Sequence, residues 1–371
     1  MTNAIPMLDL EAQHKPIRDE IRAAMDRVID KQAFILGPEV AEFEGQMAKY
    51  LGAKHAIGCA NGSDALVLAL KAMDIKHGDE VITSTFSFFA TAGAVARCGA
   101  RPVFVDIDPK TYNIDIAQIA AKITPRTKAV IPVHLFGQMT PMDELMALSN
   151  KHGFKVIEDG AQAIGAKEGG KMATTIGHIG TLSFFPSKNL GCFGDGGMVV
   201  TNDDGNADKL KRLRVHGTGK VRYHYDMVGL NSRLDTIQAA ILMVKLEHLE
   251  TWHEGRTRNA AEYDAMFAGV DQVVRPTRLP NMRHIFNQYT IRVPRRDELL
   301  DTFKKEQIGA AVYYPLPLHV QECFADLGGK KGDLPHAEKA ANDVISLPIY
   351  GELTKDQLAR VVGVVKAHVK A

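Results

Sequence analysis

The chain has 371 residues, 45% of them hydrophobic, and its 45 Lys and Arg residues nearly balance its 44 Asp and Glu residues. This length and composition predict one large globular domain with a smaller one. The formal net charge of +1 gives no electrostatic footprint for nucleic acid or for an anionic membrane. We therefore expect neither as a partner.

The four cysteines predict neither a metal site nor a disulfide framework. Cys59, Cys98, Cys192 and Cys323 lie far apart, without the spacing of zinc ligands. We therefore expect reduced thiols and no metal. The sequence shows no charged leader followed by an apolar stretch, and no apolar run of about 18 residues. A cytoplasmic protein is the simplest interpretation.

Strand-like and helix-like stretches alternate from about His55 to Val200, which predicts an α/β fold with a mostly parallel sheet wrapped by helices. The expected strands are His55–Cys59, Glu80–Thr83, Arg101–Val105, Lys128–Val133, Lys155–Glu158, Gly180–Phe185 and Met198–Thr201. Helices are expected to begin near Ser63, Ala90, Met142 and Ala207, with Ser63 as the cap of the first. Ligands of such sheets bind beyond the carboxyl ends of the strands.

A long helical pattern follows from Leu234 to about Met266. Its broad apolar face predicts a helix that packs on two sides and bridges two domains. We expect a large domain over residues 1–250 and a small α+β domain over residues 251–371. In the small domain we expect strands at Gln288–Val293 and Ala310–Tyr314, and helices at Asp297–Glu306 and Lys355–Lys366.

Lys188 is the most informative residue of the chain. It follows a short apolar run and stands between Ser187 and a glycine-rich stretch, where its amine stays reachable in a cleft. Such a lysine can form a Schiff base. Asp159, after the strand-like Lys155–Glu158, can pair with a pyridinium nitrogen, so the two residues suggest pyridoxal 5'-phosphate (PLP). Taken alone, Lys188 would more often be a solvated surface charge, and Asp159 could equally be a capping residue.

Two further segments suit the phosphate and the ring of PLP. A phosphate needs backbone N–H donors and small side chains at a helix N-terminus. Asn61-Gly62-Ser63-Asp64 follows a strand and opens a helix, so Gly62 permits close approach and Ser63 offers a hydroxyl and an amide. An ordinary strand-to-helix turn explains the same residues. The segment Phe86–Thr91, which follows a strand, either puts an aromatic face on the cofactor ring or lies in the core.

Together these motifs resemble the PLP-dependent nucleotide-sugar aminotransferases of the DegT/StrS family, over nearly the whole chain. The matching segments are Leu36–Val40, Asn61–Leu66, Glu158–Ala166, Ser183–Gly197, Gly229–Asp235, Tyr314–His319 and Ser346–Pro348. The resemblance implies a fold type I PLP enzyme with a seven-stranded sheet. It also implies a homodimer whose two active sites each borrow residues from the partner.

The resemblance implies roles for individual residues. Lys188 would bind the cofactor, Asp159 would pair with its pyridinium nitrogen, Gln162 would contact the ring hydroxyl, and Phe88 would stack on the ring. The phosphate would be held by Gly62, Ser63, Asp64 and Ser183, and Asn231 would reach the partner's cofactor. Some relatives replace the lysine with histidine and dehydrate sugars, so the presence of Lys188 favours amino transfer.

Within the family, Ser183–Gly197 and Arg222–Tyr225 are most similar to the aminotransferases of UDP-2-acetamido-2-deoxy-3-oxo-D-glucuronate. Those enzymes take nitrogen from L-glutamate, release 2-oxoglutarate, and make a 3-amino uronic acid for bacterial surface polysaccharide such as O-antigen. In them an arginine at the position of Arg233 meets the sugar carboxylate. The same arginine occurs in relatives whose substrates have no carboxylate, so it permits a uronic acid without requiring one.

The sugar itself would be bordered by Tyr313, Tyr314 and His319. Tyr313 departs from the histidine that is common at its position, which leaves the exact substrate open. A structural role explains His319 equally well. Two alternatives are a 3- or 4-aminotransferase of a dTDP- or UDP-linked 6-deoxy keto sugar and, from another class, a non-catalytic PLP-binding regulator.

Overall fold

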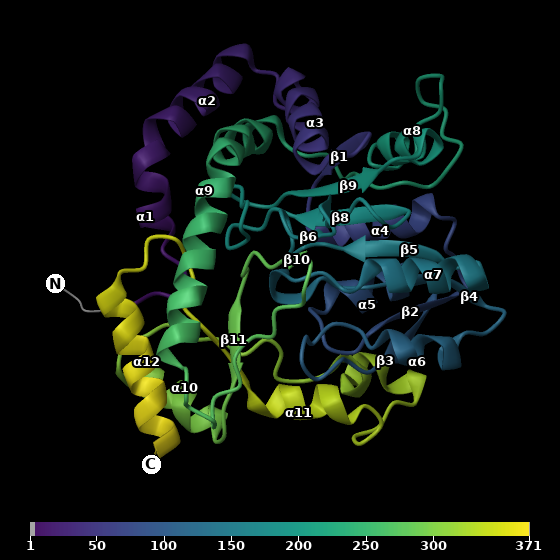
Figure 1. The fold of residues 1–371 in the computed structure, drawn as a ribbon. Helices are drawn as coiled ribbons and strands as arrows, with labels where there is room; N and C mark the ends of the chain where they lie inside the picture. The colour runs from purple at the N-terminus through teal and green to yellow at the C-terminus, as the bar shows by residue number, and fades with distance from the viewer. Residues whose placement is uncertain (1–3, 371) are drawn as a thin grey trace.

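The computed structural model describes residues 4–370 around a central seven-stranded sheet (Figure 1). The strand order is β1-β9-β8-β5-β4-β2-β3. The strands are β1 (His55–Cys59), β2 (Glu80–Ser84), β3 (Arg101–Val105), β4 (Thr127–Ile131), β5 (Lys155–Asp159), β8 (Ile179–Ser183) and β9 (Gly197–Thr201). The strand β9 runs antiparallel to both of its neighbours, β1 and β8, and the other neighbouring pairs are parallel. The predicted α/β fold and its seven strands are thereby confirmed.

Helices cover both faces of the sheet because successive side chains of a strand point to opposite faces. In β4, Ala129 and Ile131 pack in one cluster with α4 (Gly62–Ala72), α5 (Ala90–Arg97) and α8 (Asp204–Leu213). Val130 lies in the opposite cluster with α6 (Ile116–Ile119) and α7 (Met142–His152). The sheet is therefore buried on both sides, and its strand ends are left to form sites.

Two helix starts differ from the prediction because a residue upstream supplies the cap. Asn61, not Ser63, caps α4, since its Oδ1 accepts a hydrogen bond from the amide of Asp64 at 2.8 Å. The helix α8 begins at Asp204 because the side chain of Asp203 accepts from an amide of its first turn. The predicted start near Ala207 was therefore late. The predicted starts of α5 and α7 are confirmed.

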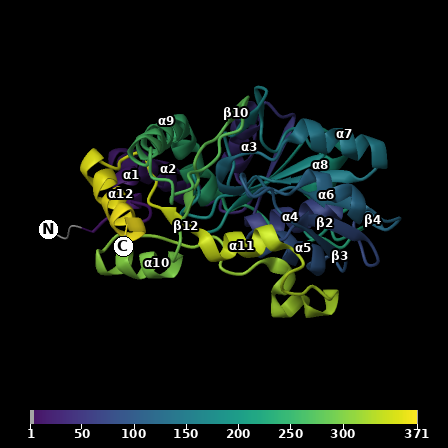
Figure 2. The same ribbon diagram turned by 60° about the horizontal axis from the view of Figure 1, so that its bottom comes forward.

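The long helix α9 (Thr236–Met266) belongs to two cores (Figures 1 and 2). Its first part packs with α2 (Arg18–Lys31) and α3 (Pro38–Leu51) beside the sheet. Its last part packs with β11 (Tyr289–Arg292), β12 (Val344–Leu347) and α12 (Lys355–Lys370). The predicted helix with contacts on two sides is confirmed. A domain boundary at residue 250 stays a prediction.

The C-terminal part contains β11, β12, α10 (Arg296–Lys305), α11 (Pro335–Asp343) and α12. The predicted strand Ala310–Tyr314 is wrong, because only Ala311 pairs with the small sheet, through two hydrogen bonds with Ser346. The chain then leaves that sheet, and Tyr313 and Tyr314 pack in a cluster against the large one. The partner of β11 is instead β12, a strand that the sequence analysis missed.

Two long-range contacts fasten the C-terminal part to earlier segments. Ile5 forms a parallel bridge with Ile308, and its side chain lies in the C-terminal core. Asp106, just beyond β3, caps α11 from outside that helix. Its two carboxylate oxygens accept hydrogen bonds from the amides of His336 and Ala337 at 2.9 and 2.8 Å. The two parts of the chain are thus joined by directed hydrogen bonds as well as by α9.

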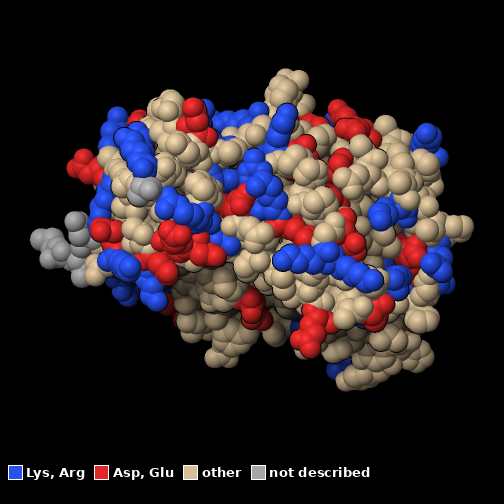
Figure 3. All heavy atoms as spheres, turned by 90° about the horizontal axis from the view of Figure 1, so that it is seen from below, with Lys and Arg blue, Asp and Glu red and all other residues tan. Residues whose placement is uncertain are grey.

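The surface carries both signs of charge. Lys and Arg side chains are interspersed with Asp and Glu over the face shown in Figure 3. No helix within residues 4–370 is long and apolar enough to cross a membrane. The four cysteines are free thiols, of which Cys59 and Cys192 are buried.

Candidate active site

The carboxyl ends of β5 and β8 bring several of the predicted residues to one edge of the sheet. Asp159 ends β5 and Ser183 ends β8, and these two strands are parallel neighbours. Lys188 follows β8 in a turn, and its backbone amide donates to the carbonyl of Phe185 at 2.8 Å. Gly62, at the start of α4, lies against Ser183. Segments more than a hundred residues apart therefore meet where an α/β sheet binds its ligands.

The amine of Lys188 is neutral far more easily than an ordinary lysine amine. Although its side chain keeps some exposure, removal from water lowers the pKa of Lys188 from 10.5 to about 8, and the charge of Asp159 opposes that shift. No acceptor among the described residues forms a hydrogen bond with its Nζ. A lysine of this kind is available as a nucleophile near neutral pH.

Asp159 is 4% exposed, and both of its carboxylate oxygens are held. Oδ2 accepts a hydrogen bond from the hydroxyl of Thr91 at 2.8 Å, and Oδ1 accepts one from the amide of Ala161 at 3.1 Å. The Thr91 hydroxyl in turn lies 3.0 Å from that of Ser87. Sequence analysis did not single out Thr91 or Ser87. The sequence signal for these two residues was their spacing of four positions, just after the strand β2.

The start of α4 forms a cradle, made by Gly62 and Ser63 against Ser183, with the groups that a phosphate needs. A Cβ at Gly62 would lie 2.6 Å from the Cβ of Ser183, so only glycine fits there. A helix leaves its first amides without partners inside the helix, and Asn61 takes the amide of Asp64. The amides of Gly62 and Ser63 therefore remain available for an anion.

Gln162 and Tyr314 lie together beside Asp159. Gln162 is buried, its Oε1 accepts from the amide of Phe136 at 2.7 Å, and its Nε2 donates to the Tyr314 hydroxyl at 3.0 Å. Burial and the charge of Asp159 raise the pKa of Tyr314 above its usual 10. Tyr314 is therefore a neutral hydroxyl that keeps its own proton for a further acceptor. Burial also raises the pKa of the neighbouring Tyr313.

Phe88 and Asp64 are less firmly tied to this group. Phe88 is 59% exposed, and its ring centroid lies 6.3 Å from that of Tyr314. The carboxylate of Asp64 lies 3.6 Å from the guanidinium of Arg97, and its amide is bound by Asn61. Stacking of Phe88 on a cofactor ring and contact of Asp64 with a phosphate stay predictions.

Asn231 and Arg233 are not brought to Lys188 within the chain. Asn231 is exposed and forms an antiparallel bridge with Val215. Arg233 is partly exposed, but its Nε is buried and has no hydrogen-bond partner. Neither residue forms a hydrogen bond or an ion pair with Lys188 or Asp159 in the described part of the chain. Contact of Asn231 with a partner's cofactor and of Arg233 with a sugar carboxylate stay predictions.

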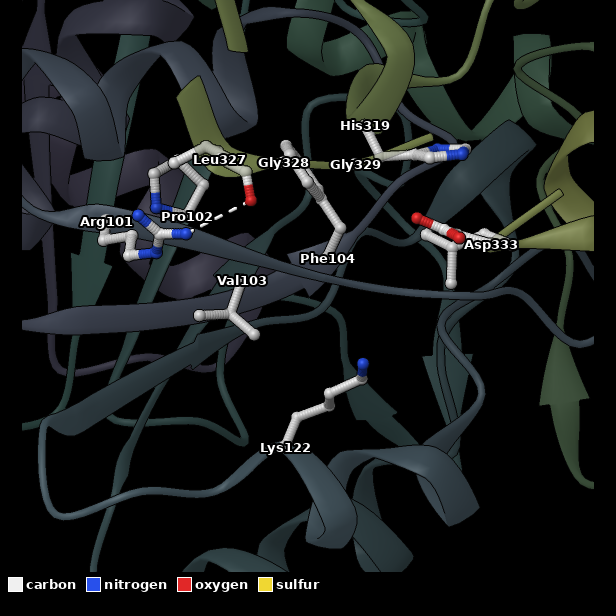
Figure 4. Close-up of a pocket in the computed structure, with 11 residues that line it drawn as sticks. Arg101, Pro102, Val103, Phe104, Lys122, His319, Leu327, Gly328, Gly329 and Asp333 are labelled. Atoms are coloured by element: carbon white, nitrogen blue, oxygen red, sulfur yellow. Dashed lines mark hydrogen bonds between the residues drawn. The ribbon is translucent and has the colours of Figure 1, made fainter. Parts of the chain in front are cut away.

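His319 is fixed by neighbours of its own. It is 3% exposed, with Nδ1 2.8 Å from the hydroxyl of Thr85 and Nε2 3.2 Å from a carboxylate oxygen of Glu338. It lines a cavity of about 400 Å³ whose other walls include Arg101 and Lys122 (Figure 4). This cavity flanks the edge strand β3, three strands from β5. The geometry supports a structural role, and contact of His319 with a sugar stays a prediction.

The convergent residues match the chemical groups of PLP. The amides of Gly62 and Ser63 suit its phosphate, the buried Asp159 carboxylate suits its pyridinium nitrogen, and the free amine of Lys188 suits its aldehyde. The narrow approach of Gly62 to Ser183 is a feature of this structure that an ordinary helix start would not need.

Curated relatives extend over nearly the whole chain. The "Pleiotropic regulatory protein" of Geobacillus stearothermophilus is 53% identical over 96% of both chains. A UDP-N-acetyl-3-dehydro-alpha-D-glucosamine 3-aminotransferase of Acidithiobacillus ferrooxidans is 47% identical, over 98% of this chain and 97% of the relative. The UDP-2-acetamido-2-deoxy-3-oxo-D-glucuronate aminotransferase of Pseudomonas aeruginosa is 46% identical, over 93% and 95%.

Solved structures show the same fold. DesV of S. venezuelae superposes with a TM-score of 0.97 at 40% identity, over all of both chains. NtdA of Bacillus subtilis, solved with its bound cofactor PMP, gives a TM-score of 0.93 at 31% identity, over 100% of this chain and 86% of NtdA. Residues 15–366 match the DegT/DnrJ/EryC1/StrS aminotransferase family. The chain therefore belongs to this family and is a PLP-dependent aminotransferase.

Proposed function

We propose that this aminotransferase transfers the amino group of L-glutamate to C3 of UDP-2-acetamido-2-deoxy-3-oxo-D-glucuronate. The choice of a uronic acid is supported by the 46% identical relative named as an aminotransferase of this glucuronate, and Arg233, whose buried Nε has no hydrogen-bond partner, is the residue that could receive the carboxylate. A free guanidinium binds a carboxylate through two parallel hydrogen bonds. Two relatives named as aminotransferases of UDP-linked 3-keto sugars support C3 as the aminated position.

Each half-reaction needs a proton to move between two carbons. PLP supplies an electron sink for the negative charge that develops when the first proton leaves. We assign the proton transfer to Lys188, because its pKa of about 8 lets the amine accept and return a proton near neutral pH. Asp159 would keep the ring nitrogen protonated, and 2-oxoglutarate would leave before the keto sugar enters.

The proposal includes a homodimer with shared active sites. Residues 215–229 project from the molecule beside α8 (Figure 1). Four large side chains of this segment are 56–82% exposed, namely Val221, Tyr223, Tyr225 and Val228. Exposed apolar side chains gathered in one segment are typical of an interaction surface. The segment leads directly into Asn231 and Arg233, so a second copy seated on it would receive both side chains.

We place the reaction in the cytoplasm, in the synthesis of bacterial surface polysaccharide such as the O-antigen of lipopolysaccharide. The four free cysteines support a reducing compartment. The amino uronic acid made in this reaction is chemically a building block for such a polymer.

A titration followed by a substrate panel tests the reaction. L-Glutamate added to the purified protein should convert the bound PLP to its amine form, seen as loss of the visible absorbance band. UDP-3-keto sugars that differ only in the C6 carboxylate should then be compared. The uronate should be preferred, and Arg233→Met should raise its KM about 10- to 100-fold while leaving the neutral sugar unchanged. A preference for neutral or 6-deoxy sugars would rule out the uronate.

Two further results test whether the protein is a catalyst and whether its two active sites are shared. If glutamate leaves the bound cofactor unchanged, the non-catalytic regulator becomes the better reading, and the Geobacillus relative carries a regulator's name. For shared sites, the inactive Lys188→Ala protein should be mixed with the Arg233→Met protein under conditions that exchange subunits, at a uronate concentration well below the raised KM of Arg233→Met. A heterodimer then holds one site with both residues intact, so activity on the uronate should return. No recovery after proven exchange would contradict sharing.

A further inference from the structure

We propose that Thr91 is a positioning residue, whose hydroxyl fixes the Asp159 carboxylate in the orientation that faces the cofactor, with Ser87 as the next link behind it. The inference rests on the proposed role of Asp159 as the partner of the pyridinium nitrogen. It adds to that role two hydroxyl residues of the segment Phe86–Thr91, of which the sequence analysis gave a role only to the aromatic side chains.

The direction of the hydrogen bonds follows from the chemistry of the three groups. An ionised carboxylate only accepts, so the Thr91 hydroxyl must donate its single proton to Oδ2 of Asp159, at 2.8 Å. The hydroxyl of Ser87, 3.0 Å away, then donates to Thr91. All three side chains are less than 5% exposed. The chain of donors therefore runs one way, from Ser87 through Thr91 to the carboxylate, with little competition from water.

The contact joins two rigid elements that are distant in sequence. Thr91 lies in the first turn of α5, and Asp159 is the last residue of β5, 68 positions later. The amide of Ala161 holds the other carboxylate oxygen at 3.1 Å. With one oxygen tied to a helix and the other to the backbone, the carboxylate cannot rotate freely. Removal of the Thr91 hydroxyl would free one side of it.

The same turn also carries the aromatic residue expected to face the cofactor. The amide of Thr91 donates to the carbonyl of Phe88 at 3.3 Å. The turn therefore holds the backbones of Phe88 and Thr91 close together, so that one short segment carries both the exposed ring and the hydroxyl. A shift of about 1 Å in such a group costs on the order of 100-fold in rate, because reacting groups must be held in a narrow geometry.

The test compares matched threonine variants of the PLP-loaded enzyme. Thr91→Val keeps the shape and removes the hydroxyl, and Thr91→Ser restores it. Thr83→Val is the control, because Thr83 is equally buried but donates to the carbonyl of Ile131, at 2.8 Å. The measurements are kcat and KM with L-glutamate, the dissociation constant of PLP, the pH midpoint of the visible band, and Tm.

Thr91→Val should lower kcat about 10- to 100-fold, weaken PLP binding about tenfold and move the pH midpoint of the band, with little change in KM. Thr91→Ser should stay within about threefold of the parent in kcat, since it keeps the donor. Ser87→Ala should give a smaller loss than Thr91→Val. Thr83→Val should change Tm alone. Equal losses in Thr83→Val and Thr91→Val, or a normal kcat and midpoint in Thr91→Val, would overturn the inference.

A double variant separates this inference from the proposed role of Asp159. If Thr91 acts through the carboxylate, Thr91→Val should cause little further loss of kcat in the Asp159→Asn background. Full additivity of the two losses would overturn the positioning role while leaving Asp159 essential. A normal kcat in Asp159→Asn itself would instead overturn the assignment of Asp159, and the role of Thr91 with it.

Discussion

Two lysines of this protein have nearly the same pKa in very different surroundings. Burial lowers the pKa of both Lys188 and Lys245 from 10.5 to about 8. Lys245, on α9, is 1% exposed and donates a hydrogen bond to the carbonyl of Gly191. Its amine also lies over the rings of Phe193 and Trp252, 5.6 and 5.9 Å from their centroids. Every side of Lys245 is thus occupied by the protein.

Lys188 differs in what its amine is left to do. It follows a strand end and has no hydrogen-bond acceptor among the described residues, and the charge of Asp159 partly opposes the lowering of its pKa by burial. The comparison teaches that a lowered pKa does not by itself identify a reactive lysine. An amine without a hydrogen-bond acceptor near a fixed carboxylate favours Lys188 as the reactive lysine, whereas Lys245 ties α9 to the loop that follows Lys188.

The largest difference between the two lysines should appear in the activity and the absorbance spectrum when each is replaced. Lys188→Ala should abolish the visible band of the lysine-bound cofactor and lower kcat by about 100- to 10,000-fold or more, because the proton carrier is lost. Lys245→Met should keep the band and most of the activity. Absorbance spectra and steady-state turnover measure both effects. Full transaminase activity in Lys188→Ala would break the assignment.

The pH dependence of cofactor loading should sharpen the comparison. Only the neutral Lys188 amine attacks an aldehyde, so loading of the cofactor-free protein should accelerate about tenfold per pH unit up to about pH 8 and then level off. Asp159→Asn removes the charge that favours the protonated amine, so its midpoint should lie below pH 8. Lys245→Met should leave the midpoint unchanged. Stopped-flow absorbance measures the rate, and a midpoint near 10.5 would contradict burial as the cause.

A substitution at Gly62 should test the proposed phosphate site at the start of α4 without changing Lys188. Gly62→Ala places a Cβ against Ser183 and should lower the free energy of unfolding by about 1–3 kcal/mol and weaken PLP binding. Gly45→Ala in α3 is the control, because a Cβ there meets nothing within 4 Å. It should stabilise the protein by about 0.5–1 kcal/mol. Urea unfolding of both variants checks the sign.

The smallest expected effect concerns Lys245 and stability in alkali. Because its pKa in the folded protein lies below 10.5, the unfolded state binds more protons between pH 8 and 10.5. Stability from this lysine therefore rises as pH increases through that window. In the Lys188→Ala background, Lys245→Met should reduce the rise in Tm by about 2 °C. An unchanged rise would show that Lys245 stays protonated in the fold.

Much of the fold could be predicted because its determinants are local. Strand patterns and the turn after each strand predicted the seven-stranded sheet, and the motifs around Lys188 and Asp159 predicted which strand ends carry the site. The bonds that hold Asp159 could not be predicted in the same way. Thr91 reaches it across 68 positions, and only the packing of α5 against the sheet sets that distance.

The errors have the same origin. The segment Ala310–Tyr314 has a strand-like composition, yet tertiary contacts of its two tyrosines draw it away from the small sheet. His319 stood in a motif that suggested substrate contact, and its buried bonds to Thr85 and Glu338 come from segments far from it in sequence or from the following helix. Sequence patterns identify elements well, but they do not show which side chain an element will meet.

The bridge between Ile5 and Ile308 has a consequence for how the chain is made. The amide of Ile5 donates to the carbonyl of Gln307 at 2.9 Å, and its carbonyl accepts from Gly309 at 2.7 Å. During synthesis the segment around Ile5 cannot pair until Ile308, about 300 residues later in the sequence, has been made. Contacts between residues so distant form slowly, because a long loop must close first. The segment around Ile5 is thus made about 300 residues before its partner and is among the last to reach its native place.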